Sequence, residues 1–412
     1  MNAYLGLAEQ AMARLDRLAE HSELPDGLTR RFLSPEHRAV ADLVAGWMRD
    51  AGMTAAMDAA GNVVGRTEGA VPGGPALIIG SHLDTVRDAG KYDGMLGVIS
   101  GIACVQALRD RGERPPFAIE VVGFGDEEGV RFQSTLLGSR ALAGDFDPAM
   151  LRATDRDGVD LRQAFLDFGL DPDAIPAIAR APEDVLAYVE LHIEQGPVLE
   201  DEGLGVGTVT AIASMARFTV YAEGVAGHAG TVPMRLRHDA LAAAAECALM
   251  VERRAKAAPG LVGTVGRFKV SPGATNVIPG AVEFNIDLRA PTDADRHALV
   301  DAVLADVAAI AERRGVALDC HKTIDEPACQ CAPWIMDQID AAIAATGGRP
   351  FRLASGAGHD AAAMARITDV GMIFVRCRDG ISHNPLEQIT VQDAAAGIAT
   401  LSSFIRHFEP RS

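Results

Sequence analysis

Short runs of apolar residues, each about the length of a strand, alternate with longer segments of helical periodicity through the first half of the chain. Residues 76–79 and 117–122 are almost continuously apolar, which is typical of strands buried on both faces. Between them apolar residues recur at helical spacing over 98–108, and an earlier helix is predicted from Pro35 to Met48. This order predicts an α/β fold with a mixed, mainly parallel sheet and helices on both of its faces.

The pattern changes near residue 214. Polar and apolar side chains alternate over 217–222, as in a half-exposed strand. A helix, two strand segments and a second helix are predicted next, at residues 240–255, 261–270, 283–289 and 293–314. This β-α-β-β-α-β order predicts an inserted ferredoxin-like α+β domain over 214–325. Residues 1–213 and 326–412, which end in a predicted helix at 391–407, are then expected to form the other domain.

The length supports two domains, because 412 residues exceed the roughly 250–300 that one hydrophobic core usually spans. The net charge of −18 disfavours binding to nucleic acids or anionic membranes. The first residues lack the basic and apolar stretches of a signal peptide, and the longest nearly apolar run, at 95–108, is too short to span a bilayer. We expect a cytoplasmic protein.

Six cysteines in a chain of this length do not indicate a disulfide framework. Cys329 and Cys331 form one close pair. Zinc sites usually need a second pair of ligands at a similar spacing, and none accompanies this one. We therefore interpret the two cysteines as structural residues.

Three histidines and two carboxylates stand in polar positions that suit metal ligands. His82 and Glu128 follow the two predicted strands, Asp93 precedes a glycine, and His192 and His383 lie in polar segments further along the chain. Imidazole and carboxylate groups together suit zinc, manganese, cobalt or nickel, and two such ions about 3.5–4 Å apart can hold an attacking and a leaving atom. A single histidine is more often a surface or core residue, so the combination carries the prediction of a two-metal hydrolytic site.

Three carboxylates of this region have different expected roles. Asp93 is expected to bridge the two ions, because one carboxylate can bind both. Asp84, two residues after His82, is expected to hold the other ring nitrogen of that histidine. Glu127 would be the base that is not a ligand. An adjacent Glu–Glu pair is often only a solvated face, so this last role depends on the rest of the site.

The motifs occur in a fixed order along the chain: His82-x-Asp84, Asp93-Gly94, Glu127-Glu128-Gly129, His192-x-Glu194-Gln195-Gly196-Pro197, Gly227-His228-Ala229-Gly230 and Ser382-His383-x-Pro385. In this order they resemble the amidohydrolase branch of the dinuclear aminoacylase/carboxypeptidase metallohydrolases. That branch contains allantoate amidohydrolases, N-carbamoyl-L-amino acid hydrolases, ureidoglycolate amidohydrolases and β-ureidopropionases. The resemblance implies two divalent metal ions per chain, with manganese a frequent activator and zinc also accommodated. It also implies a homodimer formed through the inserted lid domain.

The resemblance further implies residues that bind substrate. His228 is expected to reach the substrate carbonyl oxygen. Asn276 and Arg289 are expected to bind a substrate carboxylate, for which a planar guanidinium fork is suited. Gly356 and Gly358 belong to a Gly-x-Gly-His-Asp turn that lines the substrate pocket in the family. The alternative is that His228 is only a turn residue and that Asn276 and Arg289 stabilise the insert.

The implied reaction is hydrolysis of a ureido C–N bond, in which Glu127 accepts a proton from water and later protonates the departing nitrogen. Residues 28–35, 188–200 and 227–234 look closest to allantoate amidohydrolases, which implies conversion of allantoate to ureidoglycine, ammonia and carbon dioxide in purine catabolism. Met215 stands where many members have glutamine, which leaves open an N-carbamoyl-L-amino acid, a β-ureidopropionate or ureidoglycolate. A dipeptidase or aminoacylase would use the same metal core. A metabolite-binding protein without activity would be expected to have lost a ligand or Glu127.

Overall fold

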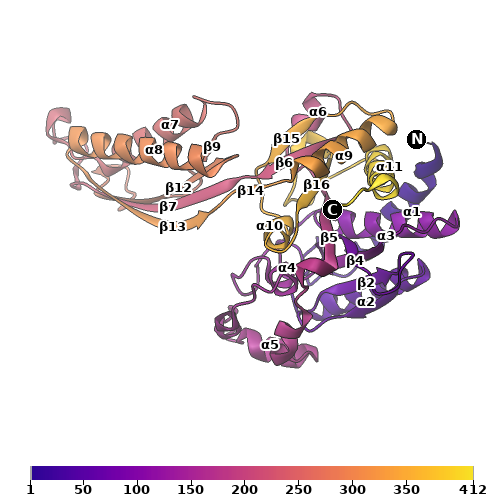
Figure 1. Ribbon diagram of the computed structural model, residues 1–412. Coiled ribbons are helices and arrows are strands. Elements are labelled where there is room, and N and C mark those ends of the chain that lie inside the picture. The colour runs from indigo at the N-terminus through magenta and orange to yellow at the C-terminus, as the bar shows by residue number, and fades with distance from the viewer. Residues whose placement is uncertain (1, 412) are drawn as a thin grey trace. The chain divides into compact units, whose positions relative to one another are not determined.

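A computed structural model describes residues 2–411. The chain divides into two compact units (Figure 1). Unit 1 comprises Met1–Thr210, Gln330–Leu353 and Ala357–Ser412, and unit 2 comprises Ala211–Cys329 and Ala354–Gly356. The chain therefore leaves unit 1, completes almost all of unit 2 and returns to unit 1.

A mixed nine-stranded sheet forms the centre of unit 1. Its order is β1 (Thr54–Met57), β2 (Val63–Thr67), β4 (Ala118–Phe124), β3 (Ala76–His82), β5 (Val185–Ile193), β16 (Val370–Val375), β6 (Val206–Ile212) and β14 (Cys329–Gln330), and β15 (Arg352–Ser355) pairs with β6. The β4–β3, β3–β5 and β5–β16 pairs are parallel. The β1–β2, β2–β4 and β16–β6 pairs are antiparallel.

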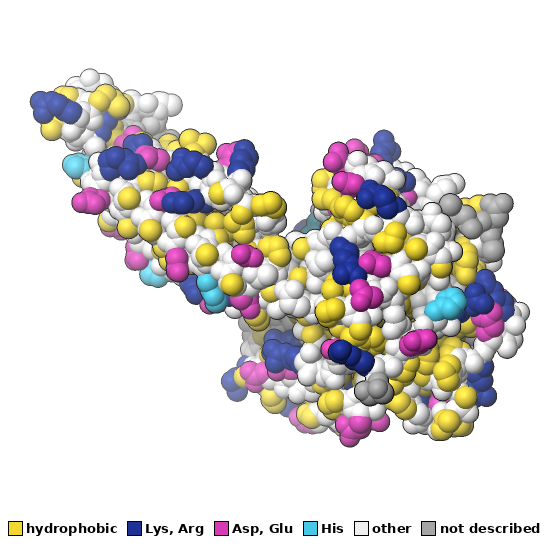
Figure 2. Space-filling view, turned by 45° about the horizontal axis from the view of Figure 1, so that its top comes forward, with side chains coloured by type: hydrophobic (Ala, Val, Ile, Leu, Met, Phe, Trp, Pro, Cys, Tyr) yellow, Lys and Arg dark blue, Asp and Glu magenta, His cyan; other side chains and the backbone are white. Residues whose placement is uncertain are grey.

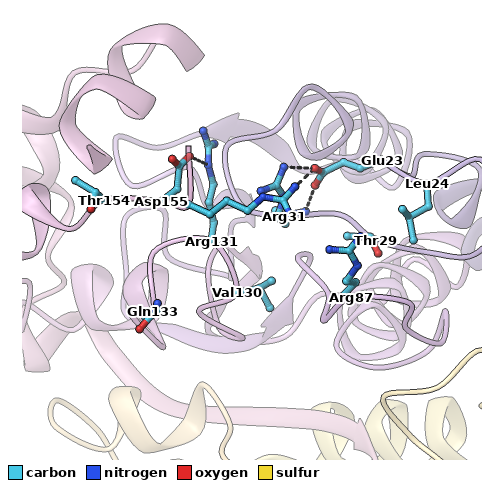
Figure 3. A pocket seen from close by; sticks show the side chains of 11 residues that line it. Glu23, Leu24, Thr29, Arg31, Arg87, Val130, Arg131, Gln133, Thr154 and Asp155 are labelled. Carbon is cyan, nitrogen blue, oxygen red and sulfur yellow. Dashed lines mark hydrogen bonds and ion pairs between the residues drawn. The ribbon is translucent and has the colours of Figure 1, made fainter. Parts of the chain in front are cut away.

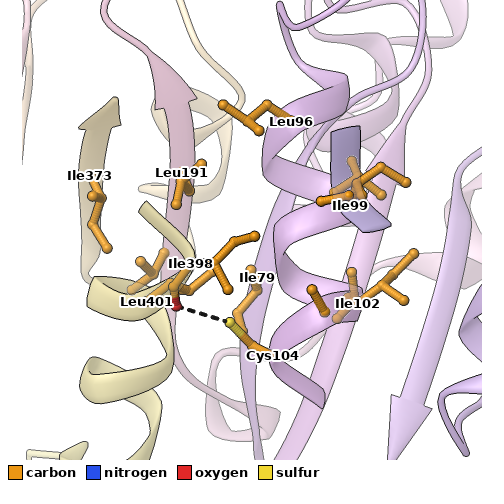
Figure 4. Close-up of a cluster of buried hydrophobic side chains, with 14 of the residues drawn as sticks. Ile79, Leu96, Ile99, Ile102, Cys104, Leu191, Ile373, Ile398 and Leu401 are labelled. Carbon is orange, nitrogen blue, oxygen red and sulfur yellow. Dashed lines mark hydrogen bonds between the residues drawn. The ribbon is translucent and has the colours of Figure 1, made fainter. Parts of the chain in front are cut away.

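Helices cover the central strands, and this is why those strands read as continuous apolar runs. Every residue of β3, β4 and β16 is buried. The helices of the same core are α1 (Asn2–Ala19), α2 (Pro35–Asp50), α3 (Met95–Asp110), α9 (Pro333–Ala345) and α11 (Val391–His407). Helix α3 packs on β3, α9 and α11 pack on β16, and α1 contacts both α3 and α11. Figure 4 shows aliphatic side chains of α3 and α11 packed with those of β3, β5 and β16.

Local capping explains where the predicted helices begin. Helix α2 starts at Pro35, as expected, and the Ser34 side chain accepts a hydrogen bond from the backbone N–H of His37. Helix α11 has the predicted bounds and a capping box between Thr390 and Asp393. The helix predicted at 98–108 is longer than expected and begins at Met95, directly after Gly94. Apolar periodicity found its middle, but the start is set by the backbone conformation of Gly94.

A second, smaller core in unit 1 is built mainly from residues between β4 and β5, joined by Phe32, Leu33 and Ala60 from earlier in the chain. It contains α4 (Leu137–Leu142), α5 (Leu161–Phe168) and short 3-10 helices at Pro148–Arg152, Pro172–Ile178 and Pro182–Asp184. Phe32, Phe132 and Phe165 are buried there. The remaining short elements of the unit are α6 (Val198–Asp201), α10 (Ala361–Met364) and a 3-10 turn at Arg378–Gly380.

Unit 2 is built on an antiparallel sheet with the order β10 (Phe268–Ser271), β12 (Ala281–Ala290), β7 (Ser214–Glu223) and β13 (Ala317–Glu326). β9 (Val262–Thr264) also pairs with β12, and β8 (Gly227–His228) pairs with β11 (Val277–Ile278). A 3-10 turn spans Met234–Leu236. Helices α7 (Ala240–Ala255) and α8 (Asp293–Arg314) have the predicted bounds. They cover the alternate residues of β7 that are buried, from Ala216 to Ala222.

The prediction of one strand over 261–270 is wrong. Thr264 lies opposite Asp287 and Phe268 lies opposite Phe284, so four steps along one strand match three along its partner. The extra residue interrupts the ladder between β9 and β10, as in a β-bulge. Apolar alternation alone does not reveal such an insertion, because it depends on the partner strand.

Figure 2 shows cationic and acidic side chains interspersed on the visible face of each unit. Within residues 2–411, no helix is both long and apolar enough to cross a bilayer.

Candidate metal centre

The parallel central strands bring three of the predicted ligand segments to one edge of the sheet. His82 is the last residue of β3, and His192 is the second-last residue of β5. Glu127 and Glu128 follow β4, which ends at Phe124. Because β4, β3 and β5 are neighbours in the sheet and run in the same direction, their carboxyl ends meet. The site thus forms where an open α/β sheet usually carries its ligands.

Asp93 lies at the centre of this edge, and its two oxygens face different partners. Oδ1 is 3.3 Å from Nε2 of His82 and 3.1 Å from Nε2 of His192. Oδ2 is 3.1 Å from Nε2 of His383. His383 Nε2 is also 3.7 Å from Glu128 Oε1. One buried carboxylate is therefore shared by two separate sets of ligand atoms.

Four triads of the described residues have the composition of a metal site, with ligand atoms within 4.8 Å of one another, and two of them share Asp93. One is His82, Asp93 and His192, and the other is Asp93, Glu128 and His383. The five residues predicted as ligands are all included, and Asp93 is the member common to both. This is the arrangement that a carboxylate bridging two ions requires. Within residues 2–411, neither Cys329 nor Cys331 belongs to a candidate ligand group.

The hydrogen bonds of two histidines leave their Nε2 atoms available as ligands. His82 Nδ1 lies 3.0 Å from the Asp84 carbonyl oxygen, and His192 Nδ1 lies 2.8 Å from the Ile193 carbonyl oxygen. A carbonyl can only accept, so each Nδ1 donates and each Nε2 of the neutral ring is an acceptor. The backbone N–H of Gly94 indeed donates to His192 Nε2 at 3.2 Å. Acceptor nitrogens then face acceptor oxygens of Asp93, a contact that a cation between them stabilises.

Asp84 contacts His82 through its backbone carbonyl, while its carboxylate binds the loop of Glu127 and Glu128. The carboxylate Oδ1 is 3.8 Å from His82 Nδ1, farther than the carbonyl oxygen. Instead the two carboxylate oxygens accept hydrogen bonds from the backbone N–H groups of Glu127 and Glu128, at 3.0 and 3.2 Å. Asp84 thereby fixes the loop that carries both glutamates.

Electrostatics at this edge also favour bound cations. Burial raises the pKa of the Glu127 carboxyl well above its ordinary value, and burial together with the charge of Asp93 raises the pKa of Glu128 to about 7. Burial acts in the same direction on Asp93, but the close ring nitrogens of His192, His383 and His82 outweigh it and hold its pKa well below the usual range. Several carboxylates are thus buried close to one another, and two divalent ions would neutralise their charge. The residues present fit two such ions.

Three residues around Asp93 were given no role by the sequence analysis. The Gln195 side-chain amide donates to Asp93 Oδ2 at 2.8 Å, and the Ser382 hydroxyl lies 3.0 Å from the same oxygen. Glu387 Oε1 accepts the backbone N–H groups of Tyr92 and Asp93 at 2.8 and 3.2 Å. Gln195 and Ser382 stand in the motifs that carry the resemblance to the family, and Glu387 lies four residues after His383, so their places in the sequence were the available signal.

A buried glutamate joins three segments behind the ligands. Glu190 accepts hydrogen bonds from the hydroxyls of Ser81 and Tyr188 at 2.9 and 3.1 Å and from the backbone N–H of Ala361 at 3.0 Å. It thereby ties β3 and β5 to Ala361, the first residue of α10, which directly follows the Gly-x-Gly-His-Asp turn. In that turn, a Cβ added to Gly358 would lie 3.9 Å from Glu127 Oε1, so the turn passes close to the expected base.

The other predicted substrate residues lie in unit 2. His228 in β8 is exposed and lies opposite Val277 in β11, next to Asn276, whose carbonyl accepts the N–H of Ala229 at 2.9 Å. Arg289 in β12 pairs with Asp287 at 2.9 Å and donates to the carbonyl of Gly356. The structure thus brings His228 close to Asn276, and Arg289 close to Gly356.

Comparison with known proteins gives a consistent result. The model of peptidase family M20/M25/M40 matches residues 78–407. An N-carbamoyl-L-amino acid amidohydrolase of Geobacillus stearothermophilus is 43% identical over 396 residues, covering 95% of this chain and 96% of that protein. An allantoate deiminase of Arabidopsis thaliana is 41% identical over 430 residues, covering 96% of this chain and 81% of that protein. A solved amidase of the hydantoinase/carbamoylase family from Burkholderia multivorans superposes with a TM-score of 0.92 at 32% identity, covering 98% of each chain.

Gly94 offers a test of the histidine geometry. A Cβ at this position would lie 2.5 Å from ring atoms of His82, and the residue has a φ of 74°. Gly94→Ala should displace the ring and weaken metal binding by roughly 10–100-fold, the usual cost of disturbing a ligand's support. Metal content of the folded protein, measured after dialysis against buffered free metal, checks this.

Gly112→Ala is the matched control for this test. Gly112 has a φ of 66°, but no atom lies within 4 Å of an added Cβ. It therefore reproduces the backbone strain without the contact to His82. Equal metal affinity in the two variants would show that the position of the His82 ring does not limit metal binding.

Proposed function

This chain belongs to the peptidase family M20/M25/M40, and on that premise we propose that it hydrolyses a ureido C–N bond at a dinuclear metal centre. It is an amidohydrolase, as its relatives are. The observation that carries the proposal is the division of Asp93 between two triads of metal-ligating side chains. Such a pair of sites suits hydrolysis of an unreactive planar carbon–nitrogen bond.

In this proposal His82, Asp93 and His192 hold one divalent ion, and Asp93, Glu128 and His383 hold the other. When bound, the ions would polarise the substrate carbonyl and lower the pKa of water. Manganese or zinc fits the mixture of imidazole and carboxylate ligands, and cobalt or nickel is compatible with it. Gln195 and Ser382 keep the Asp93 carboxylate in place through hydrogen bonds.

Glu127 is proposed to carry the proton. It lies within one cluster with His82 and Glu128 but belongs to neither of the triads that share Asp93. Its backbone N–H donates a hydrogen bond to the Asp84 carboxylate, which fixes the backbone position from which the side chain extends. It can accept a proton from the attacking water and return it to the departing nitrogen, as a general acid–base group does.

His228 is proposed to donate a hydrogen bond to the substrate carbonyl oxygen. The backbone N–H of Gly230 donates to its Nδ1 at 3.0 Å. In the neutral ring the proton is then on Nε2, which is the form that can stabilise a developing negative charge. Asn276, Arg289, Gly356 and Gly358 complete the proposed substrate contacts.

Allantoate is the substrate that we propose first, with degradation to ureidoglycine, ammonia and carbon dioxide in purine catabolism. An N-carbamoyl-L-amino acid is the second candidate, and a specific observation favours it. Met215 in β7 lies directly opposite Arg289 in β12, and side chains opposite one another share a face of the sheet. An apolar thioether beside the proposed carboxylate-binding arginine would suit the aliphatic part of an amino acid better than a second ureido group.

We further propose a homodimer formed through the 214–325 lid domain, and a cytoplasmic location. The free thiols of Cys104, Cys247, Cys320 and Cys377 are compatible with a reducing compartment. The net charge of −18 suits a soluble enzyme that acts on small molecules.

A substrate panel tests the proposed function. We expect the manganese-loaded or zinc-loaded protein to release ammonia from allantoate or from N-carbamoyl-L-amino acids, measured side by side at equal concentration. Met215→Gln should move the preference towards allantoate, because it restores a polar side chain beside Arg289. Activity on dipeptides with none on either ureido substrate would contradict the proposal.

Replacement of the expected base separates chemistry from metal binding. Glu127→Gln should lower kcat by roughly a hundredfold or more, since an amide of the same size cannot accept the proton. Metal content should stay near that of the wild type, because Glu127 is in neither triad that shares Asp93. The role as base would be refuted by a Gln variant with nearly full turnover.

A further inference from the structure

A hollow of about 340 Å³ in unit 1 has no part in the proposed reaction. Four arginines line it, Arg31, Arg87, Arg131 and Arg156, together with two acidic residues, Glu23 and Asp155. None of the metal-ligating residues is among its lining side chains. Figure 3 shows Arg31 directed towards Glu23, and Arg87 between Val130 and Leu24.

The charge of this hollow is opposite to that of the whole protein. Four guanidinium groups and two carboxylates leave it with two positive charges, whereas the chain carries a net charge of −18. Figure 3 marks no hydrogen bond or ion pair between Arg87 and the other lining residues. Among residues 2–411, the ion pair of Arg156 is the distant one with Asp157, at 3.9 Å. The positive charge of the hollow is thus incompletely neutralised by its own acidic residues.

The two inner arginines are held in fixed positions. Arg31 donates to Glu23 through Nε and Nη2, at 2.8 and 2.5 Å. Arg131 donates through Nε to Asp155 at 3.1 Å and through Nη1 to the carbonyls of Phe32 and Leu33 at 3.1 and 3.0 Å. Their side chains are only 21% and 16% exposed. One terminal nitrogen of each guanidinium is not used in these bonds, and its orientation is already set.

A neighbouring buried arginine, Arg30, holds the backbone on either side of it, which forms part of the lining of the hollow. Arg30 donates to the carbonyls of Leu83, Leu18 and His21 at 2.8, 2.9 and 3.1 Å. The flanking residues Thr29 and Arg31 both line the hollow. A ligand would therefore meet an organised set of donors, with little further loss of side-chain entropy.

We propose that this hollow binds a small organic or inorganic oxyanion, of the carboxylate or phosphate class. Guanidinium groups bind both through paired, charge-assisted hydrogen bonds. The volume is at the lower end of the range of small-molecule pockets, which suits a compact anion. Leu24 and Val130 offer apolar contact to a short carbon chain.

Part of the loop that carries the expected base lines the hollow. Val130, Arg131 and Gln133 line it and follow Glu127 and Glu128 closely in the sequence. Within this loop the N–H of Gln133 donates to the carbonyl of Gly129 at 2.8 Å, and Leu136 donates to the carbonyl of Glu127 at 3.2 Å. An anion bound to Arg131 therefore contacts the hydrogen-bonded loop that also carries Glu127 and Glu128.

Calorimetric titration of the metal-loaded protein at constant ionic strength tests the site, with succinate and inorganic phosphate as separate probes. We expect at least one probe to bind with a Kd of about 1 mM or tighter. The probe that binds more tightly identifies the carboxylate or the phosphate class. Arg87→Gln should weaken binding roughly tenfold or more, which is the effect of one lost charge-assisted hydrogen bond.

Two controls separate this site from the metal centre and from general charge effects. Arg253→Gln removes an exposed arginine from α7 in unit 2 and should leave the affinity unchanged. Titration of the protein after removal of its metal with a chelator should give the same affinity, because no lining residue is a metal ligand. The proposal is overturned if neither probe binds, if Arg87→Gln binds as the wild type does, or if binding disappears with the metal.

Discussion

Asp93 is a carboxylate that is only 4% exposed, yet both of its oxygens lie within 3.3 Å of histidine nitrogens. Leaving such a group charged and unpaired in the interior would be strongly unfavourable. The surrounding residues are arranged to prevent this: Gln195 and Ser382 donate to one oxygen, and Glu387 holds the backbone. The order of the central strands and the start of α3 directly after Gly94 bring the partners of Asp93 together.

Much of this arrangement could be predicted, because its causes are local. His82 and Glu128 follow apolar runs that can only be buried strands, and parallel strands place such residues at a common edge. Helices with strong caps, such as α2 and α11, were predicted almost to the residue. The supports around Asp93 were not found, since they come from loops far apart in the sequence. The interruption between β9 and β10 was missed for the same reason, because it depends on the register with β12.

The two units carry different parts of the proposed function. The five proposed metal ligands and Glu127 all belong to unit 1, at one edge of its sheet. Most residues proposed for substrate recognition belong to unit 2: His228 on β8, Asn276 directly before β11, Arg289 on β12, and Gly356. A change at a position such as Met215 can therefore alter the substrate without disturbing the metal ligands.

Anomalous X-ray diffraction from crystals of the metal-loaded protein, recorded at the absorption edge of the metal, tests the shared role of Asp93 most directly. Two ions per chain are predicted, one bound to Oδ1 with His82 and His192 and the other to Oδ2 with Glu128 and His383. Each ion should lie about 2.0–2.2 Å from its carboxylate oxygen. A single ion per chain, or a second ion that does not contact Asp93, would contradict the account.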